Sequence, residues 1–286
     1  MWRRSVVVSD KNSIALSVVE WSRRGLPCVL LHGFGDAACV WNHLAVRIMP
    51  EFRTVTMDLR GHGDSDWDPE TKYDTETLTA DLTKVVASLG FERMILVGHS
   101  LGAAVAMRFA ADNAARTAAV VIVDFGPELE ETGVDEVVRS FIDMPRTFAS
   151  AEAYAEWLIA RRPLAEPNQL RQLARCSLRQ SPSQGWELKA DAALATNSEI
   201  SRLEASHGRY HMPALWPALE RIKCPSLVIR GMGSGVLPSD VASRMVDRTL
   251  SAGRLVTIGG AGHAVMMDNP GEFSSSVINF LAGIAA

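Results

Sequence analysis

The sequence lacks the features of a secreted, membrane-spanning or nucleic-acid-binding protein. Its four cysteines show no C-x-x-C or cysteine–histidine ligand spacing and are too few for a disulfide scaffold. Its apolar runs, such as Ala118–Val123, are far shorter than the roughly 20 residues that span a bilayer, and the N-terminus lacks the apolar stretch of a signal peptide. Lys and Arg total 29 against 33 Asp and Glu, so no basic surface for nucleic acid is expected. We therefore expect a cytoplasmic protein with neither a nucleic-acid nor a membrane partner.

Cofactor motifs are also missing. The sequence has no metal-ligand cluster, no P-loop and no G-x-G-x-x-G dinucleotide motif, so we expect no cofactor. It has no internal repeat and no low-complexity tract. What it does have is 47% apolar and 22% charged residues in 286, the balance of an ordinary globular protein that buries a full core.

Short β-branched runs alternate with helical stretches through the first 126 residues. This alternation predicts βαβ units and a doubly wound, mostly parallel α/β sheet. Apolar residues recur at helical spacing over 74–89, with Asp74 or Thr75 placed to cap the start and Gly90 the end. Near the C-terminus the pattern resumes and is followed by a helix that starts with proline. The expected strands are Cys28–Leu31, Arg53–Asp58, Met94–Val97, Ala118–Val123, Ser226–Arg230 and Arg254–Ile258.

The composition changes between the two parts of this pattern. From Pro127 onward there is no convincing strand, and short helical patterns are separated by prolines. We therefore predict a core domain made of residues 1–126 and 223–286, with a helical cap inserted at 127–222.

The sequence G-H-S-L-G at residues 98–102 carries the strongest chemical signal. It directly follows an apolar strand and directly precedes the Ala-rich helix Ala103–Ala111. A serine at such a turn, a nucleophile elbow, is held in a strained backbone that exposes its hydroxyl, and the helix behind it directs N–H groups at developing negative charge. Ser100 is therefore the predicted nucleophile.

Three further motifs make the chain resemble the α/β-hydrolase family, which includes esterases, lactonases, carbon–carbon bond hydrolases and cofactor-free haloperoxidase-like enzymes. They are L-H-G-F-G at 31–35, D-L-R-G-H-G-D-S at 58–65 and G-G-A-G-H at 259–263, each placed after a predicted strand. The resemblance covers nearly the whole chain outside the insertion. It implies the α/β-hydrolase fold.

The resemblance also implies a role for each motif. His263, in the last motif and after Ser100 in chain order, would be the general base. The backbone N–H groups of Phe34 and Leu101 would form the oxyanion hole. His32 is better explained as a buried residue that fixes its loop by hydrogen bonds, and Arg60, His62 and Asp64 as braces of theirs.

The acid is where this chain departs from the family's common pattern. Relatives commonly carry Asp a few residues after the strand at 226–230, whereas this chain has Gly235 there and no carboxylate between Gly231 and Ser239. Some relatives place the acid at the end of the preceding strand, and there this chain has Asp124. Asp124 is therefore the implied acid, while Asp240 and a serine–histidine dyad without an acid stay open.

Aromatic residues of the insertion are expected to contact a substrate. We take Trp157, Trp186 and Tyr210 as substrate-binding residues, although a place in the cap's own core is the alternative for each. Arg161 and Arg162 would meet an acidic substrate or form a solvated face.

The function implied is that of a serine hydrolase of the carboxylic-ester class. Its substrate would be a small or medium ester, lactone or thioester, cleaved through an acyl-enzyme on Ser100. A serine nucleophile argues against epoxide opening and halide displacement, for which relatives use a carboxylate. Two alternatives stay open, namely cleavage of a carbon–carbon bond next to a ketone, and a weakly active or non-catalytic ligand-binding homologue, which Gly235 motivates. The sequence does not determine the oligomeric state.

Overall fold

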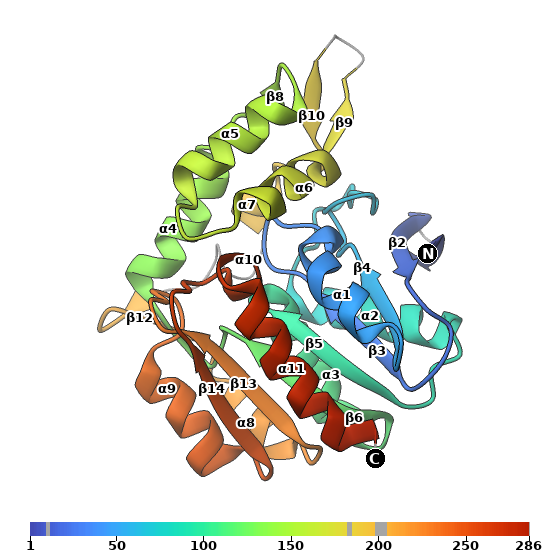
Figure 1. Ribbon diagram of the computed structural model, residues 1–286, viewed down its shortest axis with the longest axis vertical. Helices are drawn as coiled ribbons and strands as arrows, with labels where there is room; N and C mark the ends of the chain where they lie inside the picture. Colours follow the sequence, from blue (N-terminus) through green and yellow to red (C-terminus); the bar gives the residue numbers. More distant parts are fainter. Residues whose placement is uncertain (10–11, 182–184, 198–204, 286) are drawn as a thin grey trace.

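An eight-stranded sheet forms the centre of the computed structural model, which describes residues 1–9, 12–181, 185–197 and 205–285 (Figure 1). The strand order is β1-β2-β4-β3-β5-β6-β13-β14. β2 pairs antiparallel with β1 and with β4, and all other neighbours in the sheet are parallel. The strands are β1 (Trp2–Ser9), β2 (Ile14–Glu20), β3 (Pro27–Leu31), β4 (Arg53–Met57), β5 (Met94–His99), β6 (Thr117–Val123), β13 (Ser226–Gly231) and β14 (Gly253–Ile258).

The six expected strands are confirmed as β3, β4, β5, β6, β13 and β14. The N-terminal hairpin of β1 and β2 was not predicted. The reason is that β1 lies at the edge of the sheet, where only Val6 and Val8 of its side chains are buried, so its alternation is too short to stand out from the sequence.

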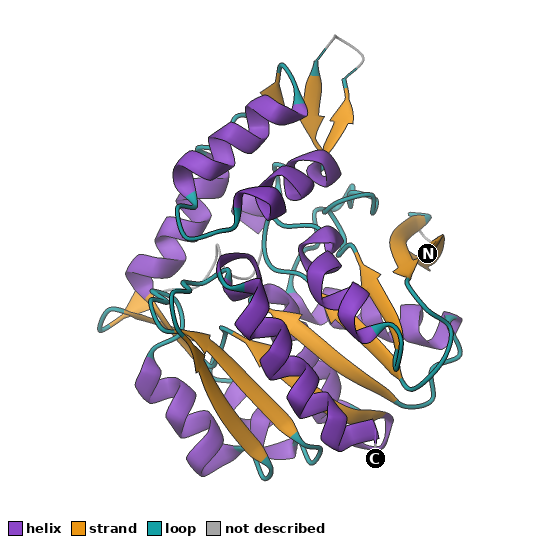
Figure 2. Cartoon of the chain, in the orientation of Figure 1, coloured by secondary structure: helices purple, strands orange, loops and turns teal. Residues whose placement is uncertain are grey.

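Helices cover both faces of the sheet (Figure 2). α1 and α11 contact each other on one face, whereas α3 contacts both α2 and α8 on the other. The helix expected over 74–89 is α2, which Asp74 caps by accepting a hydrogen bond from the Thr77 N–H. The core helices are η1 (Ala38–Trp41), α1 (Asn42–Ile48), α2 (Thr75–Ser88), α3 (Leu101–Asp112), η2 (Ala114–Arg116), α8 (Leu215–Arg221), α9 (Ser239–Arg244), η4 (Met245–Thr249), α10 (Val265–Asp268) and α11 (Pro270–Ala285).

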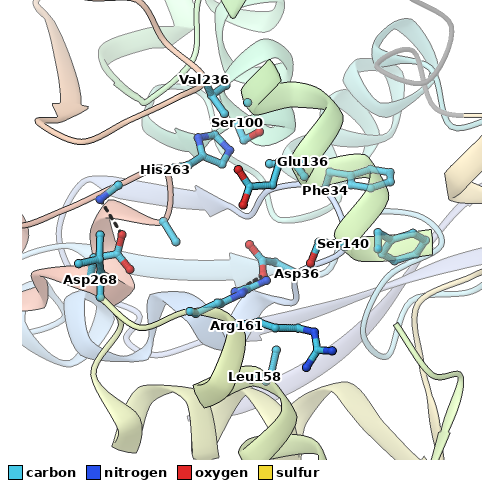
Figure 3. Close-up of a pocket in the computed structure, with 18 of the residues that line it drawn as sticks. Phe34, Asp36, Ser100, Glu136, Ser140, Leu158, Arg161, Val236, His263 and Asp268 are labelled. Carbon is cyan, nitrogen blue, oxygen red and sulfur yellow. Dashed lines mark hydrogen bonds and ion pairs between the residues drawn. The ribbon is translucent and has the colours of Figure 1, made fainter. Parts of the chain in front are cut away.

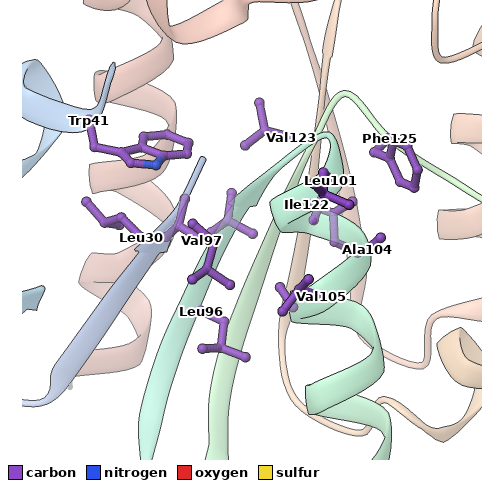
Figure 4. Packing of buried hydrophobic residues seen from close by; sticks show 14 of the residues in the cluster. Leu30, Trp41, Leu96, Val97, Leu101, Ala104, Val105, Ile122, Val123 and Phe125 are labelled. Carbon is purple, nitrogen blue, oxygen red and sulfur yellow. The ribbon is translucent and has the colours of Figure 1, made fainter. Parts of the chain in front are cut away.

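The core lies between the sheet and these helices. Every residue of β5 and of β6 is buried, as expected of parallel strands that helices cover on both faces. Figure 4 shows Val97 of β5 next to Leu30 of β3 and Val105 on α3, all within this core. On the opposite face Trp41 is fully buried, with its ring centroid 6.1 Å from that of Phe273 in α11. Within the described residues, no helix has both the length and the apolar character needed to cross a bilayer.

The predicted insertion covers the carboxyl ends of the strands. It contains short strands that were not predicted, because segments of two or three residues leave no readable alternation. α8, which the prediction placed in the insertion, packs against α3 of the core. We therefore use "cap" for residues 127–214, of which 182–184 and 198–204 lie outside the described residues. The cap consists of β7 (Glu128–Glu130), α4 (Glu131–Ile142), β8 (Thr147–Phe148), α5 (Ala151–Arg161), α6 (Pro167–Ser177), β9 (Leu178–Gln180), β10 (Trp186–Leu188), α7 (Leu194–Asn197), β11 (Ala205–Ser206) and β12 (Arg209–His211).

Candidate active site

Ser100 occupies a sharp turn between β5 and α3, where the G-H-S-L-G motif predicts it. Its backbone has φ 50° and ψ −118°, in the positive-φ region that L residues rarely adopt. The Ser100 N–H donates to the carbonyl oxygen of Val123 at 3.1 Å, which ties the turn to the end of β6. Ser100 also lines a cavity between the core and the cap. The turn therefore holds one serine in a fixed place above the strand ends.

Glycines allow this turn to pack closely against its neighbours. A Cβ atom at Gly98 would lie 2.3 Å from the carbonyl oxygen of Gly102, and one at Gly102 would lie 2.4 Å from that of Leu31. A Cβ atom at Gly33 would lie 3.2 Å from the Cβ of Ser100. The loop after β3 therefore runs directly against the serine turn.

Asp124 and His263 form a hydrogen-bonded pair beside this turn. The distance between His263 Nδ1 and Asp124 Oδ2 is 2.8 Å, although the two residues are 139 positions apart in the sequence. Asp124 directly follows β6, is fully buried and has φ 50°. Because a carboxylate only accepts hydrogen bonds, it places the imidazole proton on Nδ1 and leaves Nε2 as the basic nitrogen.

The loop after β13 supplies the remaining partners of Asp124. The Gly231 N–H donates to Oδ1 at 3.0 Å, and the Ser234 hydroxyl donates to Oδ2 at 2.5 Å. The Ser234 oxygen in turn accepts the N–H of Val236 at 3.1 Å. No role was predicted for Ser234 from the sequence. The signal available there was a hydroxyl residue within the glycine-rich loop that follows a strand.

The alternative acid is held elsewhere. Asp240 forms a two-point ion pair with Arg209, with distances of 3.0 and 3.1 Å, and more than half of its side chain is exposed. Gly235, at the position where relatives commonly carry Asp, lines the cavity. The structure thus brings Asp124, and not Asp240, to the histidine.

The two predicted oxyanion donors flank the serine. Leu101 is the first residue of α3, so its N–H belongs to the helix start, where N–H groups have no intrahelical acceptor. Phe34 lies in the loop that contacts the Ser100 turn, and its side chain lines the cavity.

His99, directly before Ser100, is a buried neighbour of His263. Burial holds the pKa of His99 well below its usual value, so the ring is neutral. Its Nε2 lies 2.9 Å from the carbonyl oxygen of His263 and must be the donor. His99 therefore fixes the backbone of the histidine loop, and its ring centroid is 4.7 Å from that of His263.

Two of the residues expected to brace their loops, His32 and His62, hydrogen-bond to loop backbone atoms. His32 contacts the Gly33 carbonyl oxygen through Nδ1 and accepts the Leu59 N–H through Nε2. His62 contacts the Arg60 carbonyl oxygen through Nδ1 and accepts the Gly35 N–H through Nε2. Burial lowers the pKa of His32 to about 4 and that of His62 to about 3, so both rings are neutral.

A cavity of about 320 Å³ separates this site from the cap (Figure 3). Ser100 and His263 line it from the core, and α4 and α5 line it from the cap. Figure 3 shows the His263 ring next to Ser100, with Glu136 opposite them. The apolar part of the wall includes Phe34, Val137, Phe141, Met144, Trp157, Leu158, Leu164 and Val236.

The three predicted substrate-binding aromatics have different places. Trp157 lines the cavity. Trp186 lies in β10, which pairs with β8 and β9 in the cap, and Tyr210 donates its hydroxyl to Asp135 at 2.6 Å. Neither Trp186 nor Tyr210 is among the residues that line the cavity. Helical spacing places Trp157 on one face of α5, but the sequence does not determine which of the three aromatic side chains reach the cavity.

Charged residues also line the cavity. Arg162 Nη1 lies 3.5 Å from Asp36 Oδ1, so this guanidinium is partly neutralised by a buried carboxylate. The Arg161 guanidinium stands 4.1 Å from the centroid of the Trp157 ring and has no carboxylate partner within the described residues. Arg161 and Glu136 line the cavity and are also exposed to solvent, so both residues lie where the cavity opens. Neither Glu136 nor Asp36 was predicted as a site residue from the sequence.

Comparison with known proteins identifies the family. The model of the family described as "Alpha/beta hydrolase family" matches residues 28–275. The chain belongs to the alpha/beta hydrolase family. Within the described part of this hydrolase, no group of three or more His, Cys, Asp or Glu side chains is arranged to hold a metal ion.

Individual relatives cover nearly the whole of this alpha/beta hydrolase. It is 28% identical over 272 residues to 2-(acetamidomethylene)succinate hydrolase of Mesorhizobium japonicum, covering 95% of this chain and 93% of the relative. It is 27% identical to a 3-hydroxybutyrate-oligomer hydrolase of Cupriavidus necator, with 89% of each chain covered. The crystal structure of E-2-(acetamidomethylene)succinate hydrolase superposes with a TM-score of 0.84 at 26% identity, over 98% of this chain and 99% of that one. The family assignment and these likenesses make the protein a hydrolase.

Proposed function

We propose that this protein is a serine hydrolase that cleaves a small or medium carboxylic ester, lactone or thioester through an acyl-enzyme on Ser100. The observation that carries the proposal is the 2.8 Å contact between His263 and a buried Asp124. Ser100, held in a strained turn, and His263 face one cavity, and Figure 3 shows the His263 ring next to Ser100. Along the chain the nucleophile, the acid and the base follow one another in the order of the family's triad.

In the proposed reaction, His263 Nε2 takes the hydroxyl proton of Ser100 as Oγ attacks the carbonyl carbon. The oxyanion that forms accepts hydrogen bonds from the N–H groups of Phe34 and Leu101. His263 then gives the proton to the leaving oxygen or sulfur, and the acyl group stays on Ser100. Water attacks this acyl-enzyme with His263 as base, which releases the acid and restores the serine. Asp124 orients the imidazole and stabilises its cation throughout.

We also propose a substrate that carries a carboxylate at the end remote from the scissile bond. Arg161, without a carboxylate partner in the described part of the chain, stands at the opening of the cavity and is held there by stacking on Trp157. The succinate and hydroxybutyrate in the names of the two relatives carry such groups. A cavity of about 320 Å³ fits an acyl group of a few carbons. We propose a reducing compartment such as the cytoplasm, where the four cysteines remain free.

The test is an ester panel combined with labelling of the nucleophile. Short-chain 4-nitrophenyl esters are offered to the wild type, to Ser100→Ala and to Ser275→Ala, a control serine exposed on α11. We expect turnover and covalent labelling by an alkyl phosphonate in the wild type and the control, and neither in Ser100→Ala. Ester cleavage that survives Ser100→Ala contradicts the mechanism. A wild type that is labelled but cleaves no ester favours carbon–carbon cleavage, and one that is neither labelled nor active favours a ligand-binding protein.

A further inference from the structure

One buried carboxylate in the cavity lacks the hydrogen bonds that the other buried aspartates of this protein have. Within the described residues, six aspartates are buried. In five of them both carboxylate oxygens accept a hydrogen bond from an N–H or O–H group at 3.1 Å or less, as buried charges require. These five are Asp58, Asp68, Asp81, Asp124 and Asp191. The sixth is Asp36, whose exposed fraction is 6%.

Asp36 has a long contact on one carboxylate oxygen and no hydrogen bond on the other. Arg162 Nη1 lies 3.5 Å from Oδ1, at the outer limit of a hydrogen bond. Oδ2 lies 3.9 Å from His99 Nδ1, too far for a hydrogen bond, and among the described residues no donor reaches it. The neutral His99 ring carries its proton on Nε2, so Nδ1 is itself an acceptor. Oδ2 of Asp36 is therefore a buried acceptor without a donor.

This oxygen is open to the cavity. Asp36 lines the cavity, and Figure 3 shows its carboxylate projecting into it. His99 Nδ1 is closed off from solvent, whereas neither oxygen of the Asp36 carboxylate is both closed off and unpartnered. A group inside the cavity can therefore donate a hydrogen bond to Oδ2.

The Asp36 carboxylate stands next to the proposed reacting groups. The Asp36 N–H donates to the Gly33 carbonyl oxygen at 3.3 Å and closes the turn that holds Phe34, the proposed oxyanion donor. A Cβ atom at Gly33 would lie 2.7 Å from His99 Nδ1 and 3.2 Å from the Cβ of Ser100, so this turn packs against the serine turn. A group bound to Asp36 would thus belong to the part of the substrate near the scissile carbonyl rather than to its remote end.

The neighbouring charge favours a neutral donor over a cation. Arg162 already places one positive charge beside Asp36, and an ammonium group on the substrate would bring a second cation next to this guanidinium. A hydroxyl is a small neutral group that can donate to the carboxylate and also accept from the guanidinium. Both of these hydrogen bonds have an ionised partner, which makes them stronger than hydrogen bonds between neutral groups.

We propose that Asp36 is a specificity-determining residue that binds a hydroxyl group of the substrate, with Arg162 donating to the same hydroxyl oxygen. The inference rests on the proposed serine hydrolase function and names its substrate class, a hydroxy-substituted ester, lactone or thioester whose hydroxyl lies near the scissile carbonyl. A methyl group in place of this hydroxyl would leave Oδ2 without a donor, and sites that hydrogen-bond a substrate hydroxyl reject such analogues strongly.

The test compares esters of nearly equal shape that carry either a hydroxyl or a methyl group. The acyl pairs are the 4-nitrophenyl esters of 2-hydroxypropanoate and 2-methylpropanoate, and those of 3-hydroxybutanoate and 3-methylbutanoate. The alcohol pair is 2-hydroxyethyl butyrate and propyl butyrate, whose cleavage is followed by proton release. Each kcat/KM is divided by the rate constant for hydrolysis of the same ester by hydroxide, which corrects for intrinsic reactivity.

We expect the wild type to prefer the hydroxyl member over its methyl partner by about tenfold or more in at least one pair. A preference within the acyl pairs assigns the hydroxyl to the acyl part of the substrate, and one within the alcohol pair assigns it to the alcohol part.

Asp36→Leu removes the acceptor at similar side-chain size. We expect it to abolish the preference while keeping kcat/KM for the methyl members. It should unfold at the same urea concentration as the wild type or a higher one, because a buried carboxylate without a donor is costly and about a third of the Arg162 side chain is exposed to water. Asp36→Asn, whose amide oxygen still accepts, should keep part of the preference. Asp240→Leu, a matched change of a surface carboxylate, should keep all of it.

A wild type that cleaves both members of every pair equally well overturns the proposal, and this is the result expected if only solvent donates to Asp36. Wild-type preference in Asp36→Leu also overturns it. If Asp36→Leu does not fold, an unchanged preference in Asp36→Asn has the same meaning. A wild type that cleaves the methyl members and is labelled on Ser100, but shows no preference, fails only this proposal. A wild type that cleaves no ester fails the hydrolase proposal as well.

Discussion

At the scale of single residues, the site depends on a carboxylate that follows β6 rather than β13. Asp124 reaches His263 because the ends of β6 and β13 are neighbours in the sheet, with Val123 paired to Ile229. The loop after β13 retains a supporting role through Ser234 and Gly231, which donate to the carboxylate. A side chain from either strand end can therefore meet the same imidazole nitrogen.

Replacement of this carboxylate should disable the histidine. Asp124→Asn presents an amide that can donate to Nδ1, which favours the wrong imidazole tautomer and removes the charge that stabilises the imidazolium. We expect kcat for a 4-nitrophenyl ester to fall by about 10³- to 10⁴-fold with little change in stability. Steady-state kinetics measure this, with Asp240→Asn as the matched control, which should stay within about twofold of the wild type because Asp240 pairs on the surface with Arg209. Equal losses in the two variants would contradict the assignment of the acid.

Arg161 and Glu136 should affect substrates of opposite charge in opposite ways. We expect Arg161→Gln to lower kcat/KM for a mono-4-nitrophenyl succinate by about five- to tenfold while leaving 4-nitrophenyl acetate nearly unchanged, as an exposed ion pair is worth about 1 kcal/mol. Glu136→Gln, which removes a carboxylate at the same opening, should raise kcat/KM for the succinate ester. The ratio of the two esters' kcat/KM checks this, and a ratio that neither variant changes would contradict a carboxylate subsite at Arg161.

At the scale of elements, the approach of α3 to β3 sets the position of the serine. Gly102 stands where the first turn of α3 meets the carbonyl oxygens of Leu31 and His32, at 2.4 and 2.5 Å from the place a Cβ would take. Backbone atoms cannot move aside as a side-chain end can. Any side chain at Gly102 must therefore push the helix away from the strand whose following loop carries Phe34.

A single methyl group tests this packing. Gly102→Ala should lower the free energy of unfolding by about 2 kcal/mol or more and reduce kcat with it, even though Ala has the higher helix propensity. Gly283→Ala in α11, where nothing lies within 4 Å of the added Cβ, should instead leave stability unchanged or raise it by up to about 1 kcal/mol. Urea denaturation of both variants makes the comparison. Equal stability of Gly102→Ala and the wild type would show that the helix start has room.

At the scale of the whole molecule, buried neutral histidines make stability depend on pH. The pKa of His32 is lowered to about 4 and that of His62 to about 3, and burial also lowers the pKa of His99. The unfolded chain binds these protons near pH 6.5, whereas the folded chain does not. The free energy of unfolding is therefore fully present above pH 6.5 and falls as the pH is lowered toward the folded-state values.

We expect the free energy of unfolding to fall by up to about 1.4 kcal/mol per pH unit for each such histidine between pH 6.5 and 5. Urea denaturation at pH 7, 6 and 5 measures the slope. His62→Gln should lower stability at pH 7 and reduce the slope by about one proton. A free energy of unfolding that is constant from pH 7 to 5 would contradict neutral burial of these rings.

The sequence by itself determined the parts of this protein that depend on neighbouring residues. Apolar runs such as that of β6 identify buried strands, and the glycines of 98–102 identify the turn that holds Ser100. These two signals are local, so no knowledge of distant contacts was needed. Asp124 was implied only by the resemblance to the hydrolase family, some of whose members carry the acid at the end of this strand.

The tertiary structure decided what depends on residues far apart in the chain. It brought His263 to Asp124, and it placed Trp157 in the cavity but Trp186 and Tyr210 outside it. The physical reason is that helical periodicity says which face of a helix is buried but not what that face meets. The cap consists of short helices and of strands of two or three residues, and the sequences of such elements are compatible with several packing arrangements. Only the contacts in the folded protein select one of these arrangements.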